Sequence, residues 1–157
     1  MKKNLPKVER LIFKTYLAMI KNSLGAKMFR NFFILSKDNK QYDAMRNGYV
    51  SCAFYVSSIL TILGLIKRVH GQVDNTVKDM LKSGWYKTKT PVIGAVIVWH
   101  KFDVGDGNPR EHIGFFIGQH QAISNDYKKR CPAKHDLTYN GKRKIKAIYW
   151  HKKLSRI

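Results

Sequence analysis

Cys52 and His112 have the residue types and the surroundings of a nucleophile and its base. Cys52 follows an Asn-Gly turn signal and a serine that is a plausible N-cap, and it opens an apolar segment that predicts a buried helix over 52–66. Backbone N–H groups and the helix dipole in a first turn favour a thiolate. His112 opens a predicted strand over 112–117. This pattern predicts a cysteine with a lowered pKa and a histidine that takes its proton.

A third polar group is needed to hold the imidazole of His112 in one tautomer. The hairpin that follows His112 makes Ser124 and Asn125 the candidates, and both stay open because one residue of hairpin length decides between them. Tyr49 lies three residues before Cys52 and is a candidate donor at an oxyanion site, beside the Cys52 backbone N–H. The alternatives are a tyrosine that packs at the helix entrance and an inert core cysteine.

The order and the flanks of these residues resemble the NlpC-type cell-wall cysteine peptidases and their CHAP-amidase relatives, a compact branch of the papain-like fold. Residues 51–56, Ser-Cys-Ala-Phe-Tyr-Val, correspond to the family's Asp-Cys-Ser-Gly-Phe-Val nucleophile helix. Residues 112–118, His-Ile-Gly-Phe-Phe-Ile-Gly, closely match its His-Val-Gly-Ile-Tyr-Ile-Gly hairpin strand. Residues 94–99 are similar to its Gly-Asp-hydrophobic strand, and the resemblance covers roughly 45–150.

The departures from the family pattern indicate a divergent member. Ser51 and Ala95 stand where the family usually has Asp, and residues 53–54 are Ala-Phe in place of Ser-Gly. The resemblance implies a cysteine hydrolase that cleaves amide bonds, with peptidoglycan stem peptides as the expected substrate. It places the third catalytic residue at Ser124, or at Asn125 after a one-residue difference in the hairpin. Deamidation, transamidation and acyl transfer use the same machinery and stay open.

The elements that must position these residues follow an α+β order, with helices first and an antiparallel sheet second. The resemblance implies a papain-like NlpC-type arrangement, in which the nucleophile helix packs on that sheet. Residues 1–40 are expected to form a basic amphipathic helical extension, and 41–157 the catalytic part of one compact domain. One or two helices are predicted over 6–35, with Gly25 as a break, and a short helix over 74–81. Further strands are predicted over 92–99, 121–125 and 145–150, and loops over 36–48, 103–109 and 126–143.

The charge of the chain points to an anionic partner. The sequence has 157 residues with 30 Lys and Arg against 10 Asp and Glu, a formal net charge of +20. Such a field attracts nucleic acid, cell-wall polymers or anionic surfaces. A basic binding module on an inactive papain-like fold is therefore the alternative function. In that case the aromatic and basic runs 85–87 and 127–130 would contact bases and phosphates.

The remaining sequence features argue against several classes of protein. Cys131 is expected to be a bystander, and a Cys52–Cys131 disulfide is disfavoured. The six histidines show no zinc-ligand spacing, so no metal or cofactor is expected. No signal peptide or membrane-spanning run is apparent. We expect a monomer made in the cytoplasm, with non-classical export for a wall substrate.

Overall fold

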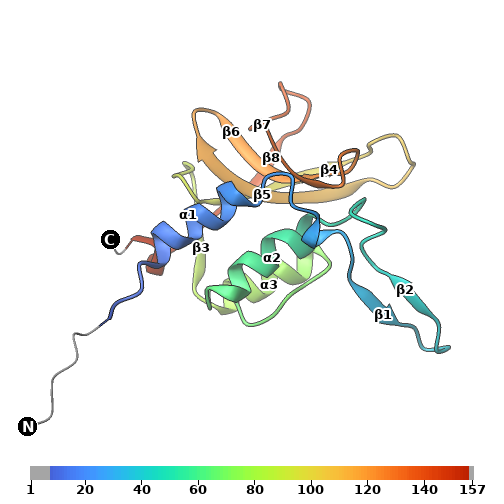
Figure 1. Cartoon of the computed structure of the whole chain (residues 1–157). Helices are drawn as coiled ribbons and strands as arrows, with labels where there is room; N and C mark the ends of the chain where they lie inside the picture. Colours follow the sequence, from blue (N-terminus) through green and yellow to red (C-terminus); the bar gives the residue numbers. More distant parts are fainter. Residues whose placement is uncertain (1–7, 156–157) are drawn as a thin grey trace, which may run out of the picture.

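The computed structural model describes residues 8–155, in which helices and antiparallel sheets form an α+β architecture (Figure 1). The helices are α1 (Ile12–Asn22), α2 (Cys52–Ile62) and α3 (Val73–Lys82), with 3-10 turns η1 (Lys27–Phe29) and η2 (Lys152–Ser155). The strands are β1 (Phe33–Leu35), β2 (Gln41–Asp43), β3 (Trp85–Thr88), β4 (Val96–Phe102), β5 (Arg110–Gly118), β6 (Gln121–Asp126), β7 (Cys131–Asp136) and β8 (Ile145–His151). None of the described helices is both long and apolar enough to cross a bilayer.

The large sheet has the strand order β3-β8-β4-β5-β6-β7, and every neighbouring pair in it is antiparallel. Its central strand β4 carries buried side chains on both faces of the sheet, since successive side chains of a strand point to opposite faces. Val96 and Val98 face the helices, whereas Ile97 and Trp99 belong to a second, smaller core on the other face. The predicted β-branched strand therefore lies in the middle of the sheet.

The helix α2, which begins at Cys52, lies in the larger core, where Figure 1 shows it beside α3 under the sheet. Its Tyr55 and Ile59 are almost completely buried, as a helix that is apolar all round requires. Tyr16 and Ile20 of α1 are also fully buried, and the Tyr16 hydroxyl donates to the Gly94 carbonyl at 2.7 Å. Thus α1 belongs to the same core as α2.

The N-terminal helices are shorter than predicted. The helix α1 ends at Asn22, and Gly25, with a φ of +75°, follows the helix end. The predicted helical region 6–35 includes residues 6–7, which lie outside the described residues, and it ends in β1. The β1–β2 hairpin turns at Asn39, which has a φ of +58°, so the expected boundary at residue 40 falls inside this hairpin. In Figure 1 the hairpin projects away from the sheet.

The loop predicted over 126–143 is wrong in its middle. Residues Cys131–Asp136 form β7, which pairs along its full length with β6. The sequence did not indicate this strand because it has little apolar character, and two of its side chains, Ala133 and His135, line a cleft of the molecule. Similarly, β2 lies within the loop predicted over 36–48, where it pairs with β1 in a short hairpin, and β3 pairs with the distant strand β8. Such short segments depend on their strand partners more than on their own sequence.

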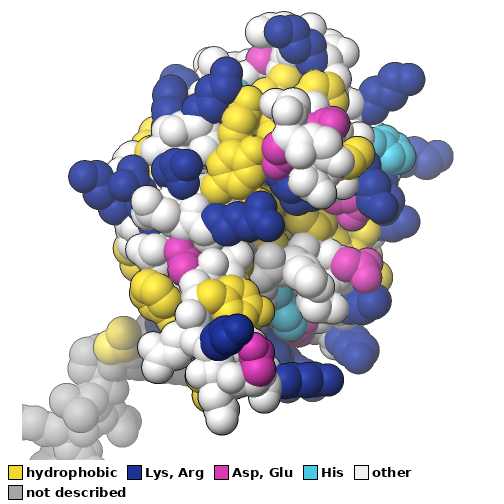
Figure 2. Space-filling model, turned by 90° about the vertical axis from the view of Figure 1, so that its right-hand side faces the viewer, with side chains coloured by type: hydrophobic (Ala, Val, Ile, Leu, Met, Phe, Trp, Pro, Cys, Tyr) yellow, Lys and Arg dark blue, Asp and Glu magenta, His cyan; other side chains and the backbone are white. Residues whose placement is uncertain are grey.

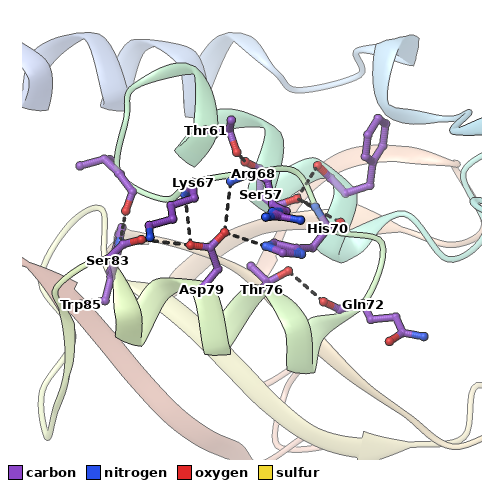
Figure 3. A network of polar contacts seen from close by, with 12 residues as sticks. Ser57, Thr61, Lys67, Arg68, His70, Gln72, Thr76, Asp79, Ser83 and Trp85 are labelled. Carbon is purple, nitrogen blue, oxygen red and sulfur yellow. Dashed lines mark hydrogen bonds and ion pairs between the residues drawn. The ribbon is translucent and has the colours of Figure 1, made fainter.

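A buried carboxylate fastens the chain that follows α2 onto α3 (Figure 3). Asp79 accepts hydrogen bonds from the backbone N–H groups of Lys67 and Arg68, from His70 Nε2 at 2.8 Å and from the Ser83 hydroxyl. Burial alone would raise the pKa of Asp79, but these hydrogen bonds outweigh it and lower the pKa to about 2. This network holds the segment that follows α2 against α3.

Candidate active site

Cys52, His112 and Ser124 line one cleft of about 1300 Å³. Cys52 is the first residue of α2, His112 lies near the start of β5, and Ser124 lies on β6. The strands β5 and β6 pair so that Gly114 is opposite Ser124. The start of α2 and the β5–β6 hairpin, which are far apart in the sequence, thus line the same cleft.

Cys52 is a free, partly buried thiol, and Cys131 is also free. Ser51 occupies the N-cap position, but its hydroxyl donates to the Phe29 carbonyl instead of capping the helix. The predicted capping hydrogen bond is therefore absent, because Ser51 is needed to join α2 to the chain before it. The N–H groups of the first turn of α2 have no intrahelical acceptors.

The pKa of Cys52 differs from the sequence-based prediction. Burial raises the pKa of the thiol above its ordinary value. The backbone N–H groups of Ile113 and Ala53 and the charge of Arg143 act in the opposite direction without cancelling this effect. The prediction of a lowered pKa was wrong because it counted the helix N-terminus and left out the loss of water. Cys52 rests as a thiol.

His112 is a neutral imidazole that is held by Ser124. Its Nε2 lies 2.7 Å from the Ser124 Oγ. Burial lowers the pKa of His112 well below its ordinary value, and the nearby Arg143 and His135 lower it further. A neutral imidazole has one protonated and one unprotonated nitrogen, so its tautomer decides which nitrogen can act as a base.

The tautomer of His112 follows from a chain of hydrogen bonds. His135 Nδ1 lies 2.7 Å from the Asp136 carbonyl, which only accepts, so Nδ1 carries the proton and Nε2 of this neutral ring accepts. Ser124 Oγ lies 2.7 Å from His135 Nε2 and therefore donates its single proton there. Consequently Ser124 accepts from His112 Nε2–H, and also from the Tyr139 hydroxyl at 3.0 Å.

This chain leaves His112 Nδ1 without a proton, which is the state that a general base requires. The rings of His135 and Tyr139 stack with their centroids 4.0 Å apart, and both pack against Trp99. Burial raises the pKa of Tyr139 to about 12, so its hydroxyl stays protonated and keeps donating to Ser124. The hydrogen-bond directions are therefore stable around neutral pH.

Of the two candidates for the third residue, the structure brings Ser124 and not Asn125 to His112. Neighbouring residues of a strand point to opposite faces, and Asn125 instead donates through Nδ2 to the Gly48 carbonyl at 2.8 Å. Its Oδ1 is buried and has no partner among the described residues. Asn125 thus ties β6 to the turn before α2.

Tyr49 lines the same cleft, but its hydroxyl is engaged elsewhere. It donates to Asp106 at 2.9 Å, and Asp106 is also paired with Arg110 at 2.5 Å. A hydroxyl that donates its only proton to a carboxylate cannot donate it to an oxyanion as well. The structure therefore shows Tyr49 as part of an ion-pair cluster at the edge of the cleft.

His135, Tyr139 and Arg143 are site residues that sequence reasoning missed. All three lie within residues 126–143, which were predicted to be a loop. Only the pairing of β7 with β6, which sets Ala133 opposite Ser124, brings His135 close to Ser124.

Lys and Arg side chains are also spread over the face shown in Figure 2, where acidic side chains are fewer.

The described residues contain no group of three or more His, Cys, Asp or Glu side chains that could hold a metal ion. The side chains that line the cleft include the Cys52 thiol, the His112 and His135 imidazoles, the Ser124 and Tyr139 hydroxyls and the Arg143 guanidinium, together with further Lys, Arg, Asp and Glu side chains. No family model matches the chain, and no curated protein matches it.

Proposed function

We propose that the protein is a thiol hydrolase that cleaves amide bonds, with Cys52 as nucleophile, His112 as base and Ser124 as the group that orients His112. The observation that carries this proposal is the hydrogen-bond chain that leaves Nδ1 of His112 unprotonated in the cleft that Cys52 lines. An inert core cysteine has no need of such an arrangement. A papain-like fold of the NlpC type belongs to the same proposal.

The proposed reaction proceeds through an acyl-enzyme. Cys52 Sγ bonds to the carbonyl carbon as its proton passes to His112 Nδ1, and the carbonyl electrons move to oxygen. The tetrahedral intermediate expels the amine, which takes that proton from His112, and a thioester remains. Water then gives a proton to His112 and attacks the thioester, which releases the acid and restores the thiol. The orphan N–H of Cys52 at the start of α2 is the proposed oxyanion donor.

The raised pKa of Cys52 and the lowered pKa of His112 suit a proton transfer that is coupled to attack. A buried neutral pair does not ionise at rest, because neither charge is well solvated. Binding of a substrate carbonyl near the N-terminus of α2 supplies the event that draws the proton across. The expected outcome is a cysteine that reacts with substrate more readily than its pKa alone suggests.

The proposed substrate class is the stem peptide of peptidoglycan. The motif resemblance suggests it, and the net charge of +20 would hold the protein on an anionic wall. The test is to incubate purified peptidoglycan with the wild-type protein and with the Cys52→Ala and His112→Ala variants, and to count new amino groups by mass spectrometry. New amines only with the wild type support the proposal, and equal amounts with Cys52→Ala contradict it.

A second candidate function rests on the positive charge of the chain and on aromatic residues that lie among its basic residues. The described cation-π contacts include Lys128 over Tyr127, within the aromatic and basic run predicted for nucleic-acid contact. A pure binding module would retain its polyanion affinity in the Cys52→Ala variant and would show no turnover in any variant. The two functions are therefore separable with one set of proteins.

A further inference from the structure

Arg143 is a cation in the cleft that forms no ion pair with an acidic side chain of the described residues. All ten Asp and Glu residues of the chain lie within residues 8–155, and none of the described ion pairs includes Arg143. It is half-buried, and burial lowers the pKa of its guanidinium. An unpaired charge in such a place is costly unless a partner arrives from outside.

The neighbouring Arg110 shows the contrast. It also lines the cleft, but Asp106 neutralises it at 2.5 Å. Arg143 Nε donates to the His100 carbonyl at 3.3 Å, and Nη2 donates to the Arg110 carbonyl at 2.6 Å. These main-chain carbonyls orient the guanidinium without cancelling its charge. Of its five N–H groups, three keep no partner among the described residues.

Arg143 lies in the same cleft as the groups that are proposed to react. It lines the same cleft as Cys52 and His112, and its guanidinium carbon Cζ lies over the Phe102 ring, 5.5 Å from the ring centroid. Tyr139 lines this cleft as well, and the charge of Arg143 acts to lower the pKa of Cys52, His112 and Tyr139. A guanidinium held in this way presents a planar fork that matches a carboxylate.

We propose that Arg143 binds a carboxylate of the substrate, which must therefore lie within a few atoms of the carbonyl that Cys52 attacks. This inference rests on the proposed function and narrows its substrate to amides that carry a nearby free acid. It also separates Arg143 from the general positive field, since two main-chain carbonyls fix the orientation of its guanidinium.

The test uses two alkylating reagents that differ only in charge. Iodoacetate carries a carboxylate beside its reactive carbon, whereas iodoacetamide is neutral and of nearly the same shape. Both react with a thiolate, so the ratio of their rates at Cys52 does not depend on the pKa of the thiol. The rates are measured by mass spectrometry at Cys52, with Cys131 as the internal reference for long-range charge effects.

The ratio of iodoacetate to iodoacetamide rates at Cys52 is expected to fall by about three-fold or more in Arg143→Gln. Arg143→Lys keeps the charge but loses the planar fork, so its rate ratio is expected to lie between those of Arg143→Gln and the wild type. This variant also replaces Arg143→Gln in the test if that protein does not fold. Lys144→Gln removes one exposed charge from the next residue, which does not line the cleft, and should leave the ratio at the wild-type value.

An unchanged ratio in Arg143→Gln would overturn the proposal. If both rates fall together, Arg143 acts only on the thiol, and if Lys144→Gln lowers the ratio equally, the effect belongs to the net charge. Failure of the proposed function itself gives a different result. Cys52 would then react with iodoacetamide at the same rate with and without His112. The ratio of the iodoacetate and iodoacetamide rates would still show whether Arg143 binds a carboxylate.

Discussion

At the scale of single residues, the state of His112 depends on a main-chain carbonyl that it does not touch. The Asp136 carbonyl fixes the proton on His135 Nδ1, and the direction passes through Ser124 to His112 Nε2. Serine alone would not orient an imidazole, since a hydroxyl can donate or accept. His135 gives this serine the acceptor role that an asparagine or carboxylate has in other triads.

His135 is therefore predicted to be a positioning residue. In His135→Ala the Ser124 hydroxyl is free to donate to His112 Nε2, which favours the tautomer with the proton on Nδ1 and removes the base. We expect the alkylation rate of Cys52 at neutral pH to fall about tenfold, with partial recovery in His135→Gln, whose side-chain oxygen can accept. Nitrogen NMR of His112 checks the tautomer directly, and an unchanged tautomer in His135→Ala would refute this role.

At the scale of elements, the glycine in the His-Ile-Gly motif has a packing function. A Cβ on Gly114 would lie 2.7 Å from both the Ile123 carbonyl oxygen and the Ser124 Cβ, and these groups belong to the neighbouring strand. The strands β5 and β6 can approach closely enough for His112 to meet Ser124 only when no side chain stands at this position. The glycine of the motif is thus required by the close approach of β5 and β6.

Gly114→Ala is expected to destabilise the protein by about 1–3 kcal/mol and to separate Ser124 from His112. Gly71→Ala is the matched control, because Gly71 lines the same cleft but its Cβ would meet only the flexible end of Met45 at 3.0 Å. Urea denaturation gives the free energy of unfolding, and alkylation of Cys52 gives the state of the site. Equal losses in both variants would show that the contact with β6 is unimportant.

The Asp79 network makes stability depend on acid pH. The folded pKa of about 2 lies below the ordinary value of about 3.9, so the stabilisation is complete above pH 4 and is lost as the pH falls through 2. Asp79→Asn should cost about 2 kcal/mol near pH 6, and this difference from wild type should shrink between pH 4 and 2. Denaturation at several pH values tests it, and a constant difference would rule out the carboxylate as the cause.

Some of these elements were predictable and some were not, for physical reasons. The helices around Cys52 and over Val73–Lys82 have strong periodicity or apolar content, so they were expected close to their observed bounds. The choice between Ser124 and Asn125 depends on strand register, which one residue of hairpin length changes. The strand β7, and with it His135, depends on a partner strand and has no apolar pattern of its own.

At the scale of the whole molecule, the net charge of +20 acts separately from the cleft. Binding to heparin or single-stranded DNA should weaken steeply and linearly on a log–log plot against salt. Cys52→Ser should leave both the affinity and this slope unchanged, because a buried thiol contributes no charge. Fluorescence anisotropy from low to physiological salt measures it, and an affinity that changes with Cys52 would contradict the separation.

The pH dependence of Cys52 alkylation by iodoacetamide, in wild type and in His112→Ala, tests the central claim most directly. With His112 as base, Cys52 of the wild type reacts at neutral pH although burial raises the pKa of the thiol. The His112→Ala variant should lose that reactivity by about tenfold or more at pH 7 and recover it only at alkaline pH, while Cys131 reacts equally in both proteins. Identical profiles for Cys52 in the two proteins would show that the thiol and the imidazole do not act together.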